Sequence, residues 1–234
     1  MFKWLKRLFQ KEVHVPRPVV VQPNPVQLPE PDPGGVELIH ANEDGMVKLA
    51  LIVGHTAHDQ GADLFGAGYG EYQYNKKVAE AAKQYAEKTY GKKVQVEIIF
   101  RDGIGILGAY AKAKELLCDV CIELHFNAAD SKAQGTETLC TPDVNDIDFA
   151  HIVHMAVCRV LGRQGTSRGV KVLSKSARGA TNVYSFAGGA NCLVEPFFGD
   201  NKDDATNGLI KYEEYAKGLV EATVLWARKN DLLF

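Results

Sequence analysis

The chain has 234 residues, a hydrophobic fraction of 46% and a formal net charge of -2. This length predicts one globular domain with an extension. The near-neutral charge gives no support for nucleic-acid binding, which usually needs a concentrated basic face. The sequence contains no apolar run long enough to span a bilayer.

Residues 1–45 differ in composition from the rest of the chain. In segment 1–10 the apolar and basic residues fall on opposite faces of a helix, a pattern typical of a helix at a membrane surface. A frayed terminus, or docking on the chain's own domain or on a partner, explains the pattern equally well. Seven of the nine prolines lie between Pro16 and Pro33 and indicate an extended spacer. We therefore divide the chain into an extension, 1–45, and a folded domain, 46–234.

Apolar runs and amphipathic stripes alternate after this extension. Continuous apolar runs predict buried strands, and stripes with a period of 3.6 residues predict helices. The predicted elements are strand 47–54, helix 71–90, strand 93–100, helix 106–117, strand 120–126, short strand 135–140, helix 147–161, strand 190–197 and helix 209–229. This alternation predicts a three-layer α/β/α sandwich with a mostly parallel central sheet.

Four titratable residues stand at the ends of these elements. His55, His125 and Glu195 close apolar strands, and Glu71 begins a helix. Because ligands collect outside the carboxyl ends of parallel strands, the four side chains can converge in one crevice. Two His and one Glu would hold one zinc ion and leave its fourth position open to water, which is the ligand count of a catalytic site.

The residues alone leave two choices open. Glu123 lies two residues before His125 and faces the same side of the strand. It could replace Glu71 as the third ligand, orient a ligating imidazole, or face a substrate groove. Glu195 is predicted to be the general base and acid, and the alternative is a buried strand-end carboxylate in an ion pair.

Six short segments follow one another in a fixed order within residues 47–230. They are Val53-Gly54-His55, Glu71 with Asn75, His125-Phe126-Asn127-Ala128, Gly135-Thr136-Glu137, Arg168-Gly169-Val170-Lys171, and Glu195 with Asn201-Lys202-Asp203-Asp204. In this order they resemble the zinc-dependent N-acetylmuramoyl-L-alanine amidases, the amidase type 3 family. The variant is closer to phage endolysins than to bacterial cell-division amidases. One departure is Glu123, where the family often has a small polar residue.

The resemblance implies hydrolysis of the amide bond between N-acetylmuramic acid and L-alanine in peptidoglycan. It implies one Zn²⁺ held by His55, Glu71 and His125, with Glu195 as the catalytic residue. Glu123 is expected in the substrate groove or behind a ligand. We also expect Asn127 to bind the substrate peptide or hold its loop. For Arg101 we expect contact with an acidic stem peptide or a local ion pair.

The charges within residues 1–10 fit a secretory signal peptide poorly. We therefore expect a cytoplasmic protein that acts on the cell wall after release or export. Two other classes stay open. One is a zinc peptidase or deacetylase on the same scaffold, and the other is a non-catalytic peptidoglycan-binding protein. The sequence gives no indication of the oligomeric state.

Overall fold

The computed structural model describes residues 45–186 and 188–233. The proposed surface helix and the proline-rich spacer lie outside the described residues, so the division at residue 45 stays a prediction. The strands are β1 (Val47–Val53), β2 (Val94–Phe100), β3 (Val120–Leu124), β4 (Thr136–Cys140), β5 (Ser167–Val172) and β6 (Ala190–Glu195). The helices are α1 (Glu71–Tyr90), α2 (Gly105–Glu115), α3 (Val144–Leu161), α4 (Ala180–Val183), α5 (Lys202–Ile210) and α6 (Tyr212–Lys229), with short 3₁₀ turns at Gly91–Lys93 and Gln164–Thr166.

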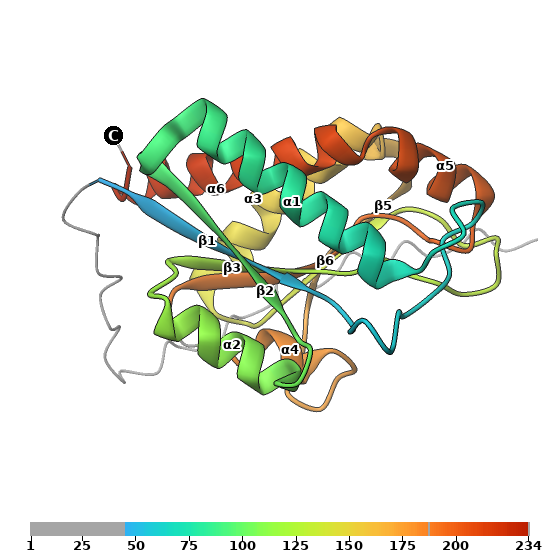
Figure 1. The fold of residues 1–234 in the computed structure, drawn as a ribbon, viewed down its shortest axis with the longest axis horizontal. Helices are drawn as coiled ribbons and strands as arrows, with labels where there is room; N and C mark the ends of the chain where they lie inside the picture. The colour runs from blue at the N-terminus through green and yellow to red at the C-terminus, as the bar shows by residue number, and fades with distance from the viewer. Residues whose placement is uncertain (1–44, 187, 234) are drawn as a thin grey trace, which may run out of the picture. The chain divides into compact units, whose positions relative to one another are not determined.

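The six strands form one sheet in the order β2-β1-β3-β6-β4-β5. Strands β2, β1, β3 and β6 run parallel to one another. Strand β4 is antiparallel to β6 and parallel to β5. The sheet is therefore mostly parallel, and helices cover both of its faces, as predicted (Figure 1). The carboxyl ends of β1, β3 and β6 meet at one end of the sheet, where the amino end of β4 joins them.

The predicted strands and the first three helices are confirmed within a few residues. The predicted helix 209–229 is wrong in its start, because two helices, α5 and α6, meet at Lys211. Helix α5 begins at Lys202 because the Asn201 side chain accepts hydrogen bonds from the first-turn amides of Asp203 and Asp204. The sequence pattern did not predict β5, a largely exposed edge strand, or α4, which has only four residues.

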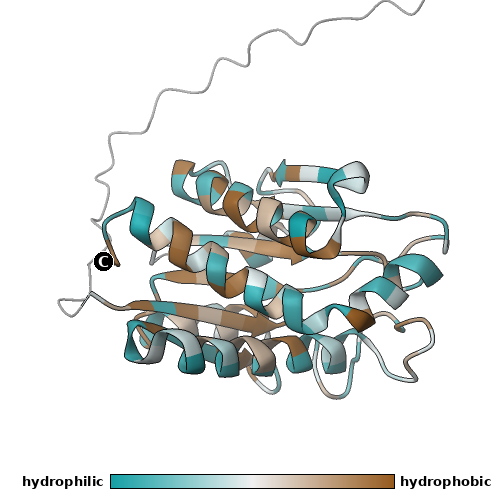
Figure 2. Ribbon diagram, turned by 90° about the horizontal axis from the view of Figure 1, so that it is seen from above, coloured by the Kyte–Doolittle hydropathy of each residue, from teal (hydrophilic) through white to brown (hydrophobic). Residues whose placement is uncertain are grey.

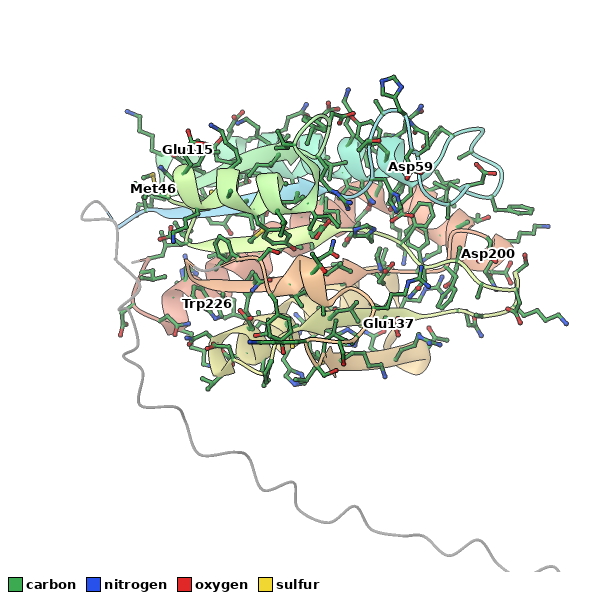
Figure 3. The ribbon with its side chains drawn as sticks, turned by 90° about the horizontal axis from the view of Figure 1, so that it is seen from below. Met46, Asp59, Glu115, Glu137, Asp200 and Trp226 are labelled. Carbon is green, nitrogen blue, oxygen red and sulfur yellow. The ribbon has the colours of Figure 1, made fainter. Side chains whose placement is uncertain are left out.

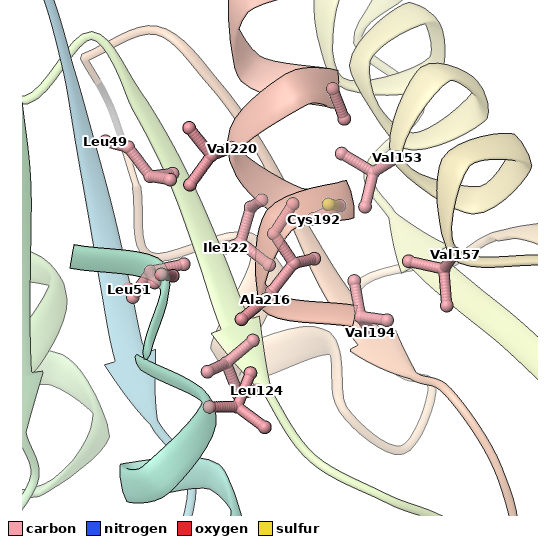
Figure 4. Packing of buried hydrophobic residues seen from close by; sticks show 14 of the residues in the cluster. Leu49, Leu51, Ile122, Leu124, Val153, Val157, Cys192, Val194, Ala216 and Val220 are labelled. Atoms are coloured by element: carbon pink, nitrogen blue, oxygen red, sulfur yellow. The ribbon is translucent and has the colours of Figure 1, made fainter. Parts of the chain in front are cut away.

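The larger apolar cluster fills the space between the sheet and helices α1, α3 and α6. Leu49 and Leu51 of β1 belong to it, whereas Ala50 and Ile52 point to a smaller cluster under α2. Figure 4 shows residues of the larger cluster from β1, β3 and β6 facing side chains of α3 and α6. Because β1 is buried on both faces, its sequence is a continuous apolar run rather than an alternating one.

The two faces of the sheet are covered unequally. Helices α1, α3 and α6 lie on one face, and of the described helices the shorter α2 and α4 lie on the other (Figure 1). The helices turn polar residues outward and apolar residues toward the sheet (Figure 2). Within the described residues, none of the helices has the length and apolarity needed to cross a membrane.

Candidate metal centre

The parallel register brings three of the predicted site residues to the same end of the sheet. Val53 of β1 pairs with Leu124 of β3, which pairs with Val194 of β6. The residues that follow these positions are therefore neighbours, and the Gly54 amide donates to the Leu124 carbonyl at 3.0 Å. This end carries the loops that contain Asp59 and Asp200 and the start of β4 at Glu137 (Figure 3).

Glu71 joins these strand ends from the first turn of α1. Its Oε1 lies 2.7 Å from His125 Nδ1, and its Oε2 lies 3.3 Å from His55 Nε2. One ligand atom from each of the three residues lies within 4.8 Å of the others. Among the described residues, no other three His, Cys, Asp or Glu side chains lie close enough together to hold a metal ion. Two imidazoles and one carboxylate suit zinc and leave a fourth position open.

The backbone around Glu71 fixes its carboxylate. Phe126 N donates to Glu71 Oε1 at 3.0 Å, and Ala62 N donates to Oε2 at 3.4 Å. One turn along α1, the Asn75 amide donates to the Leu124 carbonyl at 2.9 Å. Glu71 and Asn75 therefore have separate tasks on the same face of α1. Glu71 contacts the two imidazoles, and Asn75 joins α1 to β3.

The charges of the centre stabilise one another. Burial raises the pKa of Glu71, but hydrogen bonds and charge from His125 and His55 outweigh it and lower the pKa to about 2. Burial lowers the pKa of His125, but the two carboxylates of Glu123 and Glu71 raise it to about 10. The protein without metal therefore holds an imidazolium between two carboxylates, and a metal ion would have to displace its proton.

Two glycines allow the backbone to approach the ligands closely. A Cβ atom on Gly54 would lie 2.6 Å from His125 Cε1 and 2.7 Å from Nε2. A Cβ atom on Gly61 would lie 2.6 Å from His55 Cδ2 and 2.7 Å from Glu71 Oε2. Gly61 also has a φ of +73°, which L side chains rarely adopt. Gly54 excludes a side chain because the Leu124 carbonyl oxygen and the His125 ring occupy that space, and Gly61 excludes one because His55 and Glu71 do.

Glu195 ends β6 beside this group. Burial is the main reason that its pKa rises to about 8, with the charges of Glu71 and Glu137 adding to the rise and that of His125 opposing it. Glu137 is its cross-strand neighbour in the β4–β6 pair. Its buried Oε2 has no hydrogen-bond partner among the described residues. This geometry contrasts with a strand-end carboxylate held in an ion pair.

The remaining predicted site residues bond to protein partners. Asn127 is half-buried, and its amide donates to Glu137 Oε1 at 2.9 Å. Arg101 Nη1 donates to Glu123 Oε1 at 3.0 Å, so Arg101 forms an ion pair with a residue from another strand. Glu123 has a fully buried side chain, and no surface of it is left to touch a substrate. His125 Nε2 lies 3.2 Å from Glu123 Oε1.

Three residues near the centre were given no role by the sequence analysis. Tyr110 of α2 and Asn182 of α4 both donate to Glu123 Oε2, at 2.8 and 2.7 Å. Arg168 donates to Glu137 Oε2 at 2.9 Å from a bulge in β5. The Arg168 motif had marked the segment, but nothing in the local sequence marks Tyr110 or Asn182.

An α/β domain has the organisation of a metal-dependent hydrolase when two imidazoles and a carboxylate that could hold a metal ion lie at its strand ends beside a separate, half-buried carboxyl. Residues 49–225 match the model of the N-acetylmuramoyl-L-alanine amidase family, amidase 3. The chain belongs to this family, whose enzymes cleave the bond between N-acetylmuramic acid and L-alanine of peptidoglycan. Membership therefore confirms the resemblance found in the sequence.

Solved structures show the same fold. The catalytic domain of the amidase CwlV from Bacillus (Paenibacillus) polymyxa var. colistinus has a TM-score of 0.65 and 18% identity, covering 78% of this chain and 99% of that chain. The amidase from Clostridium difficile 630 has a TM-score of 0.67 and 19% identity, covering 79% and 98%. The catalytic domain of the CD27L endolysin targeting Clostridia difficile has a TM-score of 0.55 and 26% identity, covering 76% and 97%. No curated protein matches the sequence.

The packing of Gly61 against the ligands predicts a selective effect on metal binding. Gly61→Ala should weaken zinc binding by roughly tenfold or more, because its methyl group displaces His55 and Glu71. Gly66→Ala is a matched control, since Gly66 has the same φ of +73° and nothing within 4 Å of an added Cβ. Both variants should lose about 1–2 kcal/mol of stability from backbone strain. Chelator competition measures the affinity, and equal zinc affinities would contradict the packing argument.

Proposed function

We propose that this amidase uses one zinc ion held by His55, Glu71 and His125. The observation that carries the proposal is the convergence of their ligand atoms within 4.8 Å at the strand ends, beside a buried carboxyl with an unpartnered oxygen. A zinc ion bound there would lower the pKa of a water ligand toward ~7 and polarise the substrate's amide carbonyl. The chain's own residues then have to position the amide and move a proton.

Glu195 is the residue we assign to proton transfer. It accepts a proton as water attacks the carbonyl carbon, and it returns that proton to the leaving nitrogen of L-alanine. The burial that raises its pKa toward the working pH suits both steps. Its free Oε2 gives it an acceptor that no described protein group occupies.

Asn127 is the residue we propose for contact with the peptide part of peptidoglycan. It stands two residues after His125, and its half-buried side chain is joined to Glu137. Arg101 forms an ion pair with Glu123, whose side chain has no exposed surface, while 16% of the Arg101 side chain is exposed. A contact between Arg101 and an acidic stem peptide stays a second, weaker part of this proposal.

We further propose that the enzyme lyses a host cell wall in the manner of a phage endolysin. The similarity to an endolysin catalytic domain at 26% identity supports this context, as does the sequence resemblance to phage enzymes. Cytoplasmic synthesis followed by release to the wall belongs to the same proposal. A zinc peptidase or deacetylase activity would yield different products, which the first experiment below distinguishes.

Replacement of Glu195 should abolish turnover without removing the metal. We expect Glu195→Gln to lower the rate of peptidoglycan cleavage about 10²–10⁴-fold, because proton transfer is lost, while zinc content stays at the wild-type level. Mass spectrometry of digested peptidoglycan should show stem peptides with new L-alanine N-termini and no new sugar reducing ends. Glu97→Gln, a half-buried carboxylate of β2, is the control and should leave cleavage unchanged.

Two results would change the proposal. Equal cleavage by wild type and Glu195→Gln would remove Glu195 from proton transfer but keep the amidase. No release of stem peptides by zinc-loaded wild type would move the protein to another substrate or to a binding role.

The raised pKa of Glu195 also predicts how stability depends on pH in the metal-free protein. The folded state holds this proton up to about pH 8, whereas the unfolded chain releases it near the ordinary value of 4.5. The resulting stabilisation is complete below pH 4.5 and is lost as pH rises toward 8, on the order of 5 kcal/mol in all. Glu195→Gln cannot ionise, so urea unfolding with chelator present should show a smaller loss over this range. Parallel curves for the two proteins would contradict the assigned pKa.

We also propose that residues 1–10 attach the enzyme to a membrane surface through their apolar face and their basic residues. Deletion of residues 1–35 should then abolish sedimentation with anionic vesicles and leave peptidoglycan cleavage unchanged. Substitution of Lys3, Lys6 and Arg7 by Gln is a milder variant and should weaken binding most at low salt. Unchanged vesicle binding by the deleted protein would remove this role.

A further inference from the structure

Glu123 is a buried carboxylate with both oxygens fully used. Oε1 lies 3.0 Å from Arg101 Nη1 and 3.2 Å from His125 Nε2. Oε2 accepts hydrogen bonds from Tyr110 at 2.8 Å and from Asn182 at 2.7 Å. A carboxylate has about four acceptor sites, and all four are occupied here. Glu123 therefore has no lone pair left for a metal ion and no exposed surface for a substrate.

The four partners come from different parts of the fold. Arg101 follows the end of β2, Tyr110 lies in α2, and Asn182 lies in α4. The Tyr110 and Asn182 side chains are buried, and 16% of the Arg101 side chain is exposed. Glu123 thus ties the thinner helical layer to the strand that carries His125. Any movement of its carboxylate would break bonds to several elements at once.

The His125 ring is fixed from two opposite sides. Its Nε2 faces Glu123, and its Nδ1 lies 2.7 Å from Glu71 Oε1 within the ligand group. The Cε1 and Nε2 edge also packs against Gly54, where even a methyl group would lie 2.6 Å from Cε1. A flip of the ring would place carbon atoms against Glu71 and Glu123 and lose both contacts, so the two carboxylates fix which nitrogen faces the centre.

We propose that Glu123 is a positioning residue of the metal centre: it accepts the Nε2–H of His125 and so directs the Nδ1 lone pair to the ion. This inference rests on the proposed zinc function. A carboxylate behind a ligating imidazole fixes the tautomer and orientation of the ring and increases its basicity. Arg101, Tyr110 and Asn182 hold that carboxylate in place, and they act on the ion only through Glu123 and His125.

The consequence is a change in zinc affinity that a purely structural role would not produce. Glu123→Gln keeps the size of the side chain but loses the charge, and we expect zinc affinity to fall about 10–100-fold. Asp146→Asn is the matched control, since Asp146 is also a buried carboxylate, bonded to Thr141 and Asn191 between α3 and the sheet. Both variants should unfold at lower temperature in the metal-free state, and only Glu123→Gln should bind zinc more weakly in chelator competition.

A second measurement locates the His125 proton in the wild-type protein itself. In zinc-loaded wild type labelled with ¹⁵N-histidine, two-bond ¹H–¹⁵N spectra should show the His125 proton on Nε2 and a metal-bound Nδ1. The His125 signals are assigned by comparison with His125→Asn. Tyr110→Phe, which removes one of the four bonds, should give a loss of affinity smaller than that of Glu123→Gln.

These measurements distinguish failure of the proposed zinc function from failure of the positioning role of Glu123. Wild type that fails to bind zinc would overturn the proposed metal function and this inference with it. Wild type that binds zinc, with Glu123→Gln binding equally well or with the His125 proton on Nδ1, would overturn the positioning role and leave the proposed function standing. A loss of affinity in Asp146→Asn as large as that in Glu123→Gln would assign the effect to general destabilisation and overturn the role as well.

Discussion

The carboxylate of Glu71 is the interaction on which the rest of the centre depends. It receives hydrogen bonds from the Phe126 and Ala62 amides and lies against the imidazoles of His55 and His125. Those contacts join the first turn of α1 to the segments that follow β1 and β3. Burial of a carboxylate is costly unless it is paired and hydrogen-bonded. The backbone amides and the two imidazoles together offset this cost for the Glu71 carboxylate. Loss of this carboxylate would remove the contacts between the first turn of α1 and these segments as well as one of the three groups that could bind a metal ion.

The charges around the centre explain why it suits a divalent cation. The buried carboxylates of Glu71 and Glu123 and the half-buried Glu195 lie near the imidazoles of His55 and His125. Without metal, protons on His125 and Glu195 reduce the negative charge, as the raised pKa values of both groups show. A divalent metal ion would supply positive charge at the same place, so it would replace these protons instead of adding charge to a site that is already neutral. Metal binding and proton release are then one equilibrium.

The sequence predicted the elements whose local pattern agrees with their tertiary environment. Strands β1 and β3 are buried on both faces and have continuous apolar sequences, and their ends place His55 and His125 together by parallel register. Strand β5 is an exposed edge strand, so burial leaves no pattern in its sequence. The Arg101–Glu123 pair joins β2 and β3 across the intervening β1. Such a pair depends on the strand order, which local sequence does not encode.

The unequal covering of the sheet relates the fold to its substrate. Glu123 pairs in register with Ile52, which belongs to the apolar cluster under α2, so Glu123 and His125 face the thinner helical layer. Glu195 and Glu137 face the same side through the β6 and β4 registers. The extensive core under α1, α3 and α6 lies on the opposite side. The larger apolar core is therefore on one face of the sheet, and the strand-end groups Glu123, His125 and Glu195 are on the other, so Glu71 of α1 has to reach them from the first turn of its helix.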